Sequence, residues 1–154
     1  MQKIIPVLWF SDRAEEAANF YASIFPDSKI TNLSHFGEGG LRAKGTVMTA
    51  TLEIHGQRFM TLNGGGEPFS QAVSFMVNCE TQEEVDRLWQ KLSEGGVEQP
   101  CGWLKDKFGV SWQIIPIALS RLLGHKDPEK AKRVMTAMLK MKKLEIAELE
   151  EAAE

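Results

Sequence analysis

Two cysteines and three histidines are the side chains of this chain best suited to nucleophilic or metal chemistry. Cys79 and Cys101 are too few for a disulfide framework, and a nucleophilic cysteine needs a neighbouring base or positive charge to form its thiolate. Lys105 and Lys107 follow Cys101 closely, but the sequence does not fix where their amines point. We therefore interpret both cysteines as small apolar core residues in a reducing cytoplasm.

The histidines show no spacing typical of a metal site. His35 ends a predicted strand, His55 lies in a predicted turn and His125 lies in a linker near the C-terminus. A local metal motif would place ligands within a few residues of one another. We expect solvated or locally bonded histidines, with only His35 near the mouth of a predicted module.

Composition excludes several classes of function. The chain has 154 residues, of which 43% are hydrophobic and 25% charged, and its net charge is −3. This length fits one domain, and the acidic balance disfavours binding to nucleic acid or to anionic membranes. No apolar run approaches the roughly 20 residues that cross a bilayer. We expect a cytoplasmic protein with no nucleic-acid partner and no membrane partner.

A weak internal repeat organises the chain. Shifting the sequence by 68 residues places 14–17 over 82–85, and each copy then continues as an amphipathic helix. The apolar stripes are Ala14, Ala17, Ala18, Tyr21, Ile24 and Phe25 in the first helix and Val85, Leu88, Trp89 and Leu92 in the second. Asp12 is the predicted N-cap of the first helix, and Thr81 is that of the second.

Short strands surround each predicted helix. One strand precedes each helix, and further strands are expected at about 29–36, 46–54, 57–63, 97–100, 102–105 and 111–115. His55-Gly56 is the expected turn between two of them. The order β-α-β-β-β, found twice, predicts an α+β fold rather than a parallel α/β sheet.

The last part of the chain is predicted to be a helical tail. Asp127 and Pro128 are typical of a helix start. A broad apolar face follows, made of Ala131, Val134, Met135, Met138, Leu139, Met141 and Leu144. Such a face is typical of core packing or subunit contact. The basic residues of this stretch are followed by acidic ones, which indicates mutual compensation rather than a nucleic-acid patch.

Several segments resemble one known family. Residues 5–17, 77–86 and 101–116 are similar to the PhnB-like branch of the vicinal oxygen chelate (glyoxalase/bleomycin resistance/dioxygenase) superfamily. The resemblance covers about residues 3–116 and much of the tail. It implies a single domain over 1–154, with module one at 3–63, module two at 71–116 and the helical tail at 117–154. It also implies that the two βαβββ modules form an open curved barrel around a ligand site.

The resemblance also locates the superfamily's metal site. Its metalloenzymes hold a divalent ion with His and Glu from the first and last strand of each module. The repeat aligns 56–60 with 109–113, so Met60 and Gln113 stand where the two Glu ligands would be. Pro6 and Ser74 occupy the corresponding first-strand positions, with Ile4 and Ala72 as the alternatives two residues away. These side chains are poor ligands, so we expect no metal and no cofactor.

Relatives in this branch have been labelled as ubiquinone-pathway methyltransferases. S-adenosylmethionine is normally held by a glycine-rich loop between a strand and a helix. Residues 37–40 and 64–66 are glycine-rich but lead to strands or linkers. We regard the methyltransferase label as unsupported by this sequence.

Strand alternation predicts which side chains line a pocket. We expect one face of each sheet to pack against its helix. The side chains on these faces are Ile5, Val7 and Trp9 in the first module and Val73, Phe75, Val77 and Trp112 in the second. The opposite face supplies the ligand-pocket candidates, which are Pro6, Leu8, Arg58, Met60, Ser74, Met76, Ser111 and Gln113. No catalytic residue is assigned.

These residues predict a metal-independent, homodimeric protein that binds a small, partly apolar molecule. Binding or sequestration and metal-independent catalysis both remain open. For catalysis, Gln113, Ser74 or Arg58 would polarise an oxygen. The alternative is a metal-dependent lyase or dioxygenase of the same superfamily.

Overall fold

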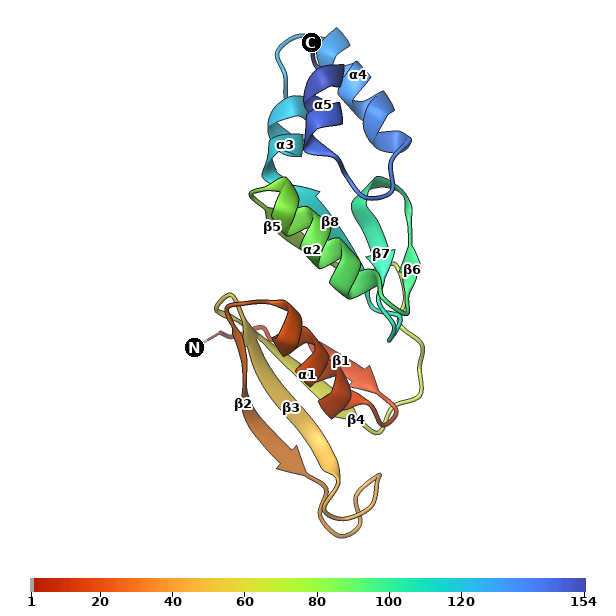
Figure 1. Ribbon diagram of the computed structural model, residues 1–154. Coiled ribbons are helices and arrows are strands. Elements are labelled where there is room, and N and C mark those ends of the chain that lie inside the picture. The colour runs from red at the N-terminus through yellow and green to blue at the C-terminus, as the bar shows by residue number, and fades with distance from the viewer. Residues whose placement is uncertain (1) are drawn as a thin grey trace. The chain divides into compact units, whose positions relative to one another are not determined.

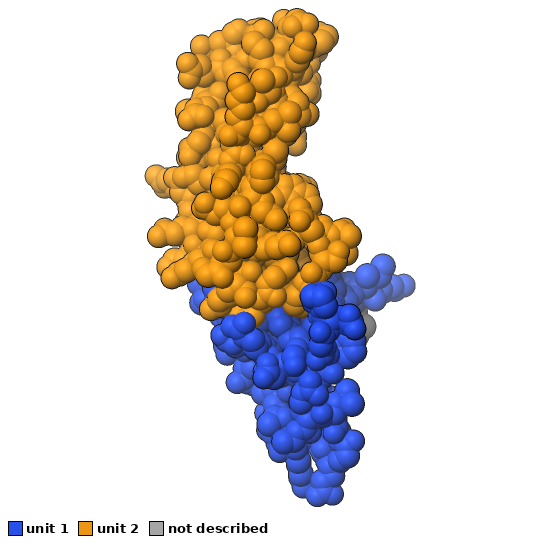
Figure 2. All heavy atoms as spheres, turned by 90° about the vertical axis from the view of Figure 1, so that its right-hand side faces the viewer, with its two compact units in different colours: residues 1–68 blue, residues 69–154 orange. Residues whose placement is uncertain are grey.

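The structure, a computed structural model, describes residues 2–154 and divides into two compact units, residues 1–68 and 69–154 (Figure 2). Met1 lies outside the described residues. Each unit holds one four-stranded sheet with a helix against one of its faces (Figure 1). Each is described below by itself.

The first unit has the predicted β-α-β-β-β order. Its elements are β1 (Val7–Phe10), α1 (Ala14–Ile24), β2 (Ser28–His35), β3 (Val47–Ile54) and β4 (Gln57–Asn63). The strands lie in the order β1-β4-β3-β2, with β1 parallel to β4 and the other pairs antiparallel. The turn between β3 and β4 is the predicted His55-Gly56, where both residues have a positive φ, 48° and 79°.

The predicted faces of β1 are wrong. Leu8 pairs with Thr61 of β4, and the Thr61 hydroxyl donates to the carbonyl of Ala14 in α1 at 2.8 Å. Paired residues of neighbouring strands point to the same side of a sheet, so Leu8 lies on the face that α1 covers. Val7 and Trp9 lie on the other face and are 49% and 45% exposed.

The predicted cap of α1 is also wrong. Helix α1 begins after Arg13, and no side chain next to it in sequence caps it. Instead, Asn63 at the end of β4 accepts the N–H of Ala14 at 2.8 Å and donates to the Val47 carbonyl at 3.0 Å. Asn63 therefore ties the helix start to two strands.

The second unit repeats this order. Its elements are β5 (Ser74–Cys79), α2 (Gln82–Ser93), β6 (Val97–Glu98), the 3₁₀ turn η1 (Pro100–Gly102), β7 (Trp103–Lys105) and β8 (Ser111–Pro116). The strands lie in the order β5-β8-β7-β6, with β5 parallel to β8. The Thr81 cap is confirmed, because its hydroxyl accepts the N–H of Glu84 at 3.1 Å.

The strand expected at 97–100 is shorter than predicted. It ends at Glu98, and the chain then turns through η1, where Cys101 has a φ of 63°. The N–H of Cys101 donates to the Met141 carbonyl at 2.9 Å, and that of Gly102 donates to the Lys142 carbonyl at 2.8 Å. The turn therefore forms one of the contacts between the second unit's sheet and the C-terminal tail.

The tail is helical, as predicted, but contains three short helices: α3 (Ile117–Leu123), α4 (Pro128–Leu139) and α5 (Ile146–Ala152). A single apolar face was expected to run on to Leu144, yet α4 ends at Leu139. The tail residues Leu119, Leu122, Val134, Leu144 and Leu149 form a buried cluster with Ile115 of β8. Met135 and Leu139 remain 41% and 61% exposed. Within residues 2–154, none of the helices has the length and apolar character of a membrane span.

Candidate functional site

The hairpin of β7 and β8 is organised by one buried carboxylate. Asp106, only 2% exposed, follows β7. Its Oδ1 accepts the N–H groups of Phe108 and Val110 at 2.9 and 3.1 Å, and its Oδ2 accepts the Trp112 indole N–H at 2.9 Å. The buried Asp106 carboxylate thus holds the turn in place, and it also fixes the register of β8.

That register separates the two faces of the second sheet. Trp112 and Ile114 are 3% and 0% exposed, and they lie on the face packed against α2. Ser111 and Gln113 alternate with them and therefore lie on the opposite face. The predicted directions of Trp112 and Gln113 agree with this register.

Two rows of paired residues cross β7, β8 and β5 on the face away from α2. One row is Lys105, Ser111 and Ser74, and the other is Trp103, Gln113 and Met76. Neighbouring strands are about 4.8 Å apart, so each row spans the reach of a small organic molecule. The structure therefore brings four of the predicted candidates together: Ser74, Met76, Ser111 and Gln113.

Hydrogen bonding within these rows is incomplete. The Gln113 amide donates to the Ser74 hydroxyl at 2.9 Å. Ser111 is 1% exposed, and its hydroxyl has no hydrogen-bond partner among the residues that the structure describes. A buried hydroxyl without a partner costs free energy, which a ligand atom could offset. Met76, by contrast, is 57% exposed and presents an apolar surface.

The first unit distributes its four candidates differently. Met60 and Arg58 lie on the face of the sheet away from α1, and Arg58 is 3.9 Å from the carboxylate of Glu53. Leu8 lies on the α1 face, which corrects its assignment to the pocket side. Pro6 precedes β1, and its carbonyl accepts the N–H of Met60 at 3.0 Å.

A divalent metal ion does not fit the donors at the inferred positions. The inferred positions are Pro6 and Met60 in the first unit and Ser74 and Gln113 in the second. Their side chains offer an alkyl ring, a thioether, a hydroxyl and an amide. Oxygen- and nitrogen-seeking ions need carboxylates or imidazoles instead. Within residues 2–154, no three His, Cys, Asp or Glu side chains converge as a metal site would require.

S-adenosylmethionine does not fit the glycine-rich segments. Residues 37–40 lie between β2 and β3, and residues 64–66 follow β4 and lead toward β5. Neither segment begins a helix, so neither has the helix-start geometry that cradles such cofactors. A Cβ at Gly65 would lie 2.7 Å from the Trp9 ring, so this glycine is explained by packing.

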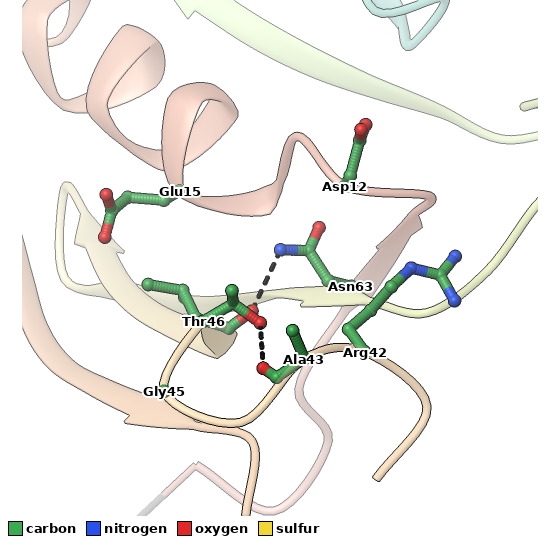
Figure 3. A pocket seen from close by; sticks show the side chains of 8 residues that line it. Asp12, Glu15, Arg42, Ala43, Gly45, Thr46 and Asn63 are labelled. Atoms are coloured by element: carbon green, nitrogen blue, oxygen red, sulfur yellow. Dashed lines mark hydrogen bonds between the residues drawn. The ribbon is translucent and has the colours of Figure 1, made fainter.

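The first unit also has an open hollow of about 530 Å³, which the sequence did not predict. It is lined by Asp12, Glu15, Arg42, Ala43, Gly45, Thr46, Val47 and Asn63. Figure 3 shows Asp12, Glu15 and Arg42 pointing apart rather than toward a common centre. The oxygen and the nitrogen of the Asn63 amide are both already hydrogen-bonded, to Ala14 and to Val47. The Thr46 hydroxyl donates to the Ala43 carbonyl at 2.6 Å. The hollow therefore has no converging polar groups for a ligand.

The cysteines, His55 and His125 have interactions within their own units. Burial raises the pKa of the Cys79 thiol to about 12, with the charge of Glu84 adding to the effect, so Cys79 stays a thiol at neutral pH. Cys101 lies in η1, which packs on the tail. The His55 ring lies 3.9 Å from Asp27, and the His125 ring accepts the N–H of Asp127 at 3.0 Å.

Trp103 and Lys105 are the two members of the rows that the sequence reasoning missed as site residues. Both are half-buried, and both pair directly with residues that were predicted. A signal for them was present, because residues 102–105 were expected to form a strand beside 111–115. Antiparallel pairing of those strands places Trp103 opposite Gln113 and Lys105 opposite Ser111.

Comparisons with known proteins agree with this architecture. The chain matches the family described as 3-demethylubiquinone-9 3-methyltransferase over residues 2–115. A solved PhnB protein from Bacillus cereus is 40% identical over 75% of this chain and 99% of that chain, with a TM-score of 0.69. Among curated protein sequences, none matches the chain. The family match ends within β8, so the tail, which the resemblance was expected to cover in large part, lies outside it.

More distant structures show the fold alone. Protein PA1353 from Pseudomonas aeruginosa is 24% identical over 75% of this chain and 98% of that chain, with a TM-score of 0.65. The fosfomycin resistance protein FosX from Listeria monocytogenes, solved with Mn(II) and sulfate, is 13% identical over 74% of this chain and 91% of that chain, with a TM-score of 0.55. These likenesses confirm the predicted glyoxalase/bleomycin-resistance-like α+β fold.

Proposed function

This chain belongs to the family described as 3-demethylubiquinone-9 3-methyltransferase, the PhnB-like branch of the vicinal oxygen chelate superfamily, and we propose that it binds a small, partly apolar molecule without a metal ion. The proposed site is the face of the second sheet away from α2. Ser74, Met76, Ser111 and Gln113 are its central residues. In the first unit, taken by itself, Arg58 and Met60 remain candidates on the face away from α1, whereas Leu8 does not.

One observation carries the proposal. The Gln113 amide donates to Ser74 at 2.9 Å, at the strand position where metalloenzymes of the superfamily have a metal-binding Glu. A carboxylate replaced by a neutral, hydrogen-bonded amide favours recognition of a ligand oxygen or amide over coordination of an ion. Apolar surface at Met76 beside these polar groups is the usual composition of a small-molecule site.

Binding or sequestration is favoured over catalysis on this face. General acid–base catalysis needs a group such as His, Asp or Glu within hydrogen-bond reach of the substrate. The two rows contain two serines, a glutamine, a lysine, a tryptophan and a methionine. These groups can orient a ligand and hold its oxygen atoms, and none of them is an ordinary general base at neutral pH.

We also propose that the protein is a cytoplasmic homodimer. Val7 and Trp9 leave apolar surface exposed on the first sheet, and Met135 and Leu139 do so on α4. A symmetric partner that covers such surface would be stabilised by its burial. Light scattering during size-exclusion chromatography should give twice the chain mass, and a monomer at micromolar concentration would refute the dimer.

The binding proposal is tested by native mass spectrometry of gently purified protein, followed by affinity measurement with any molecule retained. Gln113→Leu should keep the fold but weaken binding by about 0.5–1.5 kcal/mol, the value of one neutral hydrogen bond. The matched control is Gln90→Leu, the same substitution at an exposed position of α2. Equal affinities of the two variants would contradict a role for Gln113.

A further inference from the structure

We propose that the ligand of this site carries an anionic oxygen group, and that Lys105, with Ser111 and Ser74, recognises it. The inference rests on the proposed function and adds the chemical class of the ligand, which is a small organic acid with an apolar body. The shared chemistry is an oxyanion, whether a carboxylate or a phosphonate.

The first observation is the charge of the row. Lys105, Ser111 and Ser74 are paired directly across three strands, so the row begins with an ammonium group and continues with two hydroxyl groups. Lys105 is half-buried, and its ammonium makes no ion pair or hydrogen bond within the part of the chain that the structure describes. Asp106, the next residue, lies on the other face, where it binds Trp112. The positive charge on this face is therefore not neutralised by its neighbour.

The second observation is the direction of the hydrogen bonds. Gln113 donates to the Ser74 oxygen, so the Ser74 hydrogen is left to donate elsewhere. The Ser111 hydroxyl, in a residue 1% exposed, has no partner among the described residues. Two hydroxyl donors and one ammonium on adjacent strands match the acceptor-only oxygen atoms of an oxyanion.

The adjacent row supplies the apolar part of the site. Trp103 and Met76 flank Gln113 on the same face, two residues along each strand from Lys105 and Ser74. A molecule with its anionic end over the first row would lay an alkyl or aryl body over this second row. Both rows belong to one sheet, so the second unit alone carries the observations behind this inference.

The test uses matched pairs of small molecules with the full-length protein. Phenylacetate and phenylphosphonate are the anionic probes, and phenylacetamide is the neutral one. Binding is followed at millimolar probe concentrations by NMR shifts of the Met76 methyl group and the Trp103 indole N–H. Both acids, or one of them, should bind more tightly than the amide. Lys105→Gln should weaken acid binding about tenfold or more and leave amide binding unchanged, because a charge-assisted hydrogen bond is lost.

Two further variants separate recognition from folding. Lys107→Gln removes a cation from the adjoining turn and should leave acid affinity unchanged. Ser111→Ala should weaken acid binding without lowering stability, because it removes a buried hydroxyl that has no partner.

The outcomes distinguish this inference from the proposed function. If acids and amide bind equally, or if acid binding survives Lys105→Gln, the oxyanion inference is overturned and small-molecule binding stands. If neither class perturbs Met76 or Trp103, both proposals are overturned.

Discussion

The indole N–H of Trp112 donates to the buried Oδ2 of Asp106 at 2.9 Å, across the turn that joins β7 to β8. This bond fixes Trp112 on the α2 face of the sheet. Gln113, the next residue, is thereby held on the opposite face with Ser74 and Met76. The geometry of the candidate site therefore depends on a carboxylate that lies on the other side of the sheet.

Replacement of Asp106 should strongly destabilise the protein. Asp106→Ala leaves two buried donors and the half-buried N–H of Phe108 without their acceptor, and each such loss costs about 1–3 kcal/mol, so we expect about 3 kcal/mol or more. Urea unfolding measures this free energy. The control is Asp12→Ala at an exposed residue that does not cap α1, which should change stability by no more than about 0.5 kcal/mol. Equal effects of the two substitutions would contradict the role assigned to Asp106.

Asn63 should contribute more to the stability of the first unit than its position at the end of a strand indicates. Asn63→Ala removes the acceptor for the N–H of Ala14 and the donor to Val47, and we expect a loss of about 1–3 kcal/mol. Chemical denaturation measures the change. Asn32→Ala, at an exposed position of β2, is the matched control and should be near neutral.

The tail should be part of the folded second unit. The Gln82 side chain in α2 donates to the Leu144 carbonyl at 3.0 Å and accepts the N–H of Ile146 at 2.7 Å. Gln82→Met keeps the length of the side chain but removes both bonds, together with the one that the Gln82 amide donates to Asp86 at 2.9 Å, so it should cost about 1–3 kcal/mol, while Gln90→Met should not. Deletion of residues 127–154 removes the buried Val134, Leu144 and Leu149 and should destabilise the protein further. An unchanged melting temperature after this deletion would show that the tail is dispensable.

Cys79 should give a pH dependence at alkaline pH. Burial raises the pKa of its thiol from 9.0 to about 12, so the unfolded chain releases the proton at lower pH than the folded chain. The folded state then binds more protons between pH 9 and 12, and stability falls as pH rises through this window. The wild type should lose more stability across this window than Cys79→Ala. At pH 8, iodoacetamide should modify Cys79 only after unfolding, and rapid modification in the native state would contradict its burial.

Metal content should be negligible, because the positions that the internal repeat and the family resemblance assign to the two Glu ligands hold Met60 and Gln113, which are poor ligands. Elemental analysis of tag-free protein should find far less than one equivalent of Mn, Fe, Co, Ni or Zn per chain. A stoichiometric metal whose removal by a chelator abolishes an activity would contradict the site assignment.

Local pattern was sufficient where polar and apolar residues alternate or where a cap is adjacent in sequence. Ser111, Gln113 and Trp112 alternate clearly, so their faces could be predicted and agree with the register. Thr81 caps α2 from the neighbouring position, which sequence proximity reveals. The β-α-β-β-β order followed from the same local signals, because the period of apolar residues differs between helices and strands.

Only the tertiary structure determined the direction of side chains in uniformly apolar strands and the residue that caps α1. Residues 7–10 are all apolar, so a period of two has no contrast by which to choose a face, and only pairing with Thr61 placed Leu8 against α1. The first N–H of α1 is capped by Asn63 rather than by Asp12, because Asn63 is distant in sequence but adjacent in the fold. Ser74 is a similar case, because only the pairing of β5 with β8 places it beside Ser111, which is distant in sequence. Pairing between strands that are distant in sequence determines which of their side chains share a face, and the local pattern of one strand does not specify its partner.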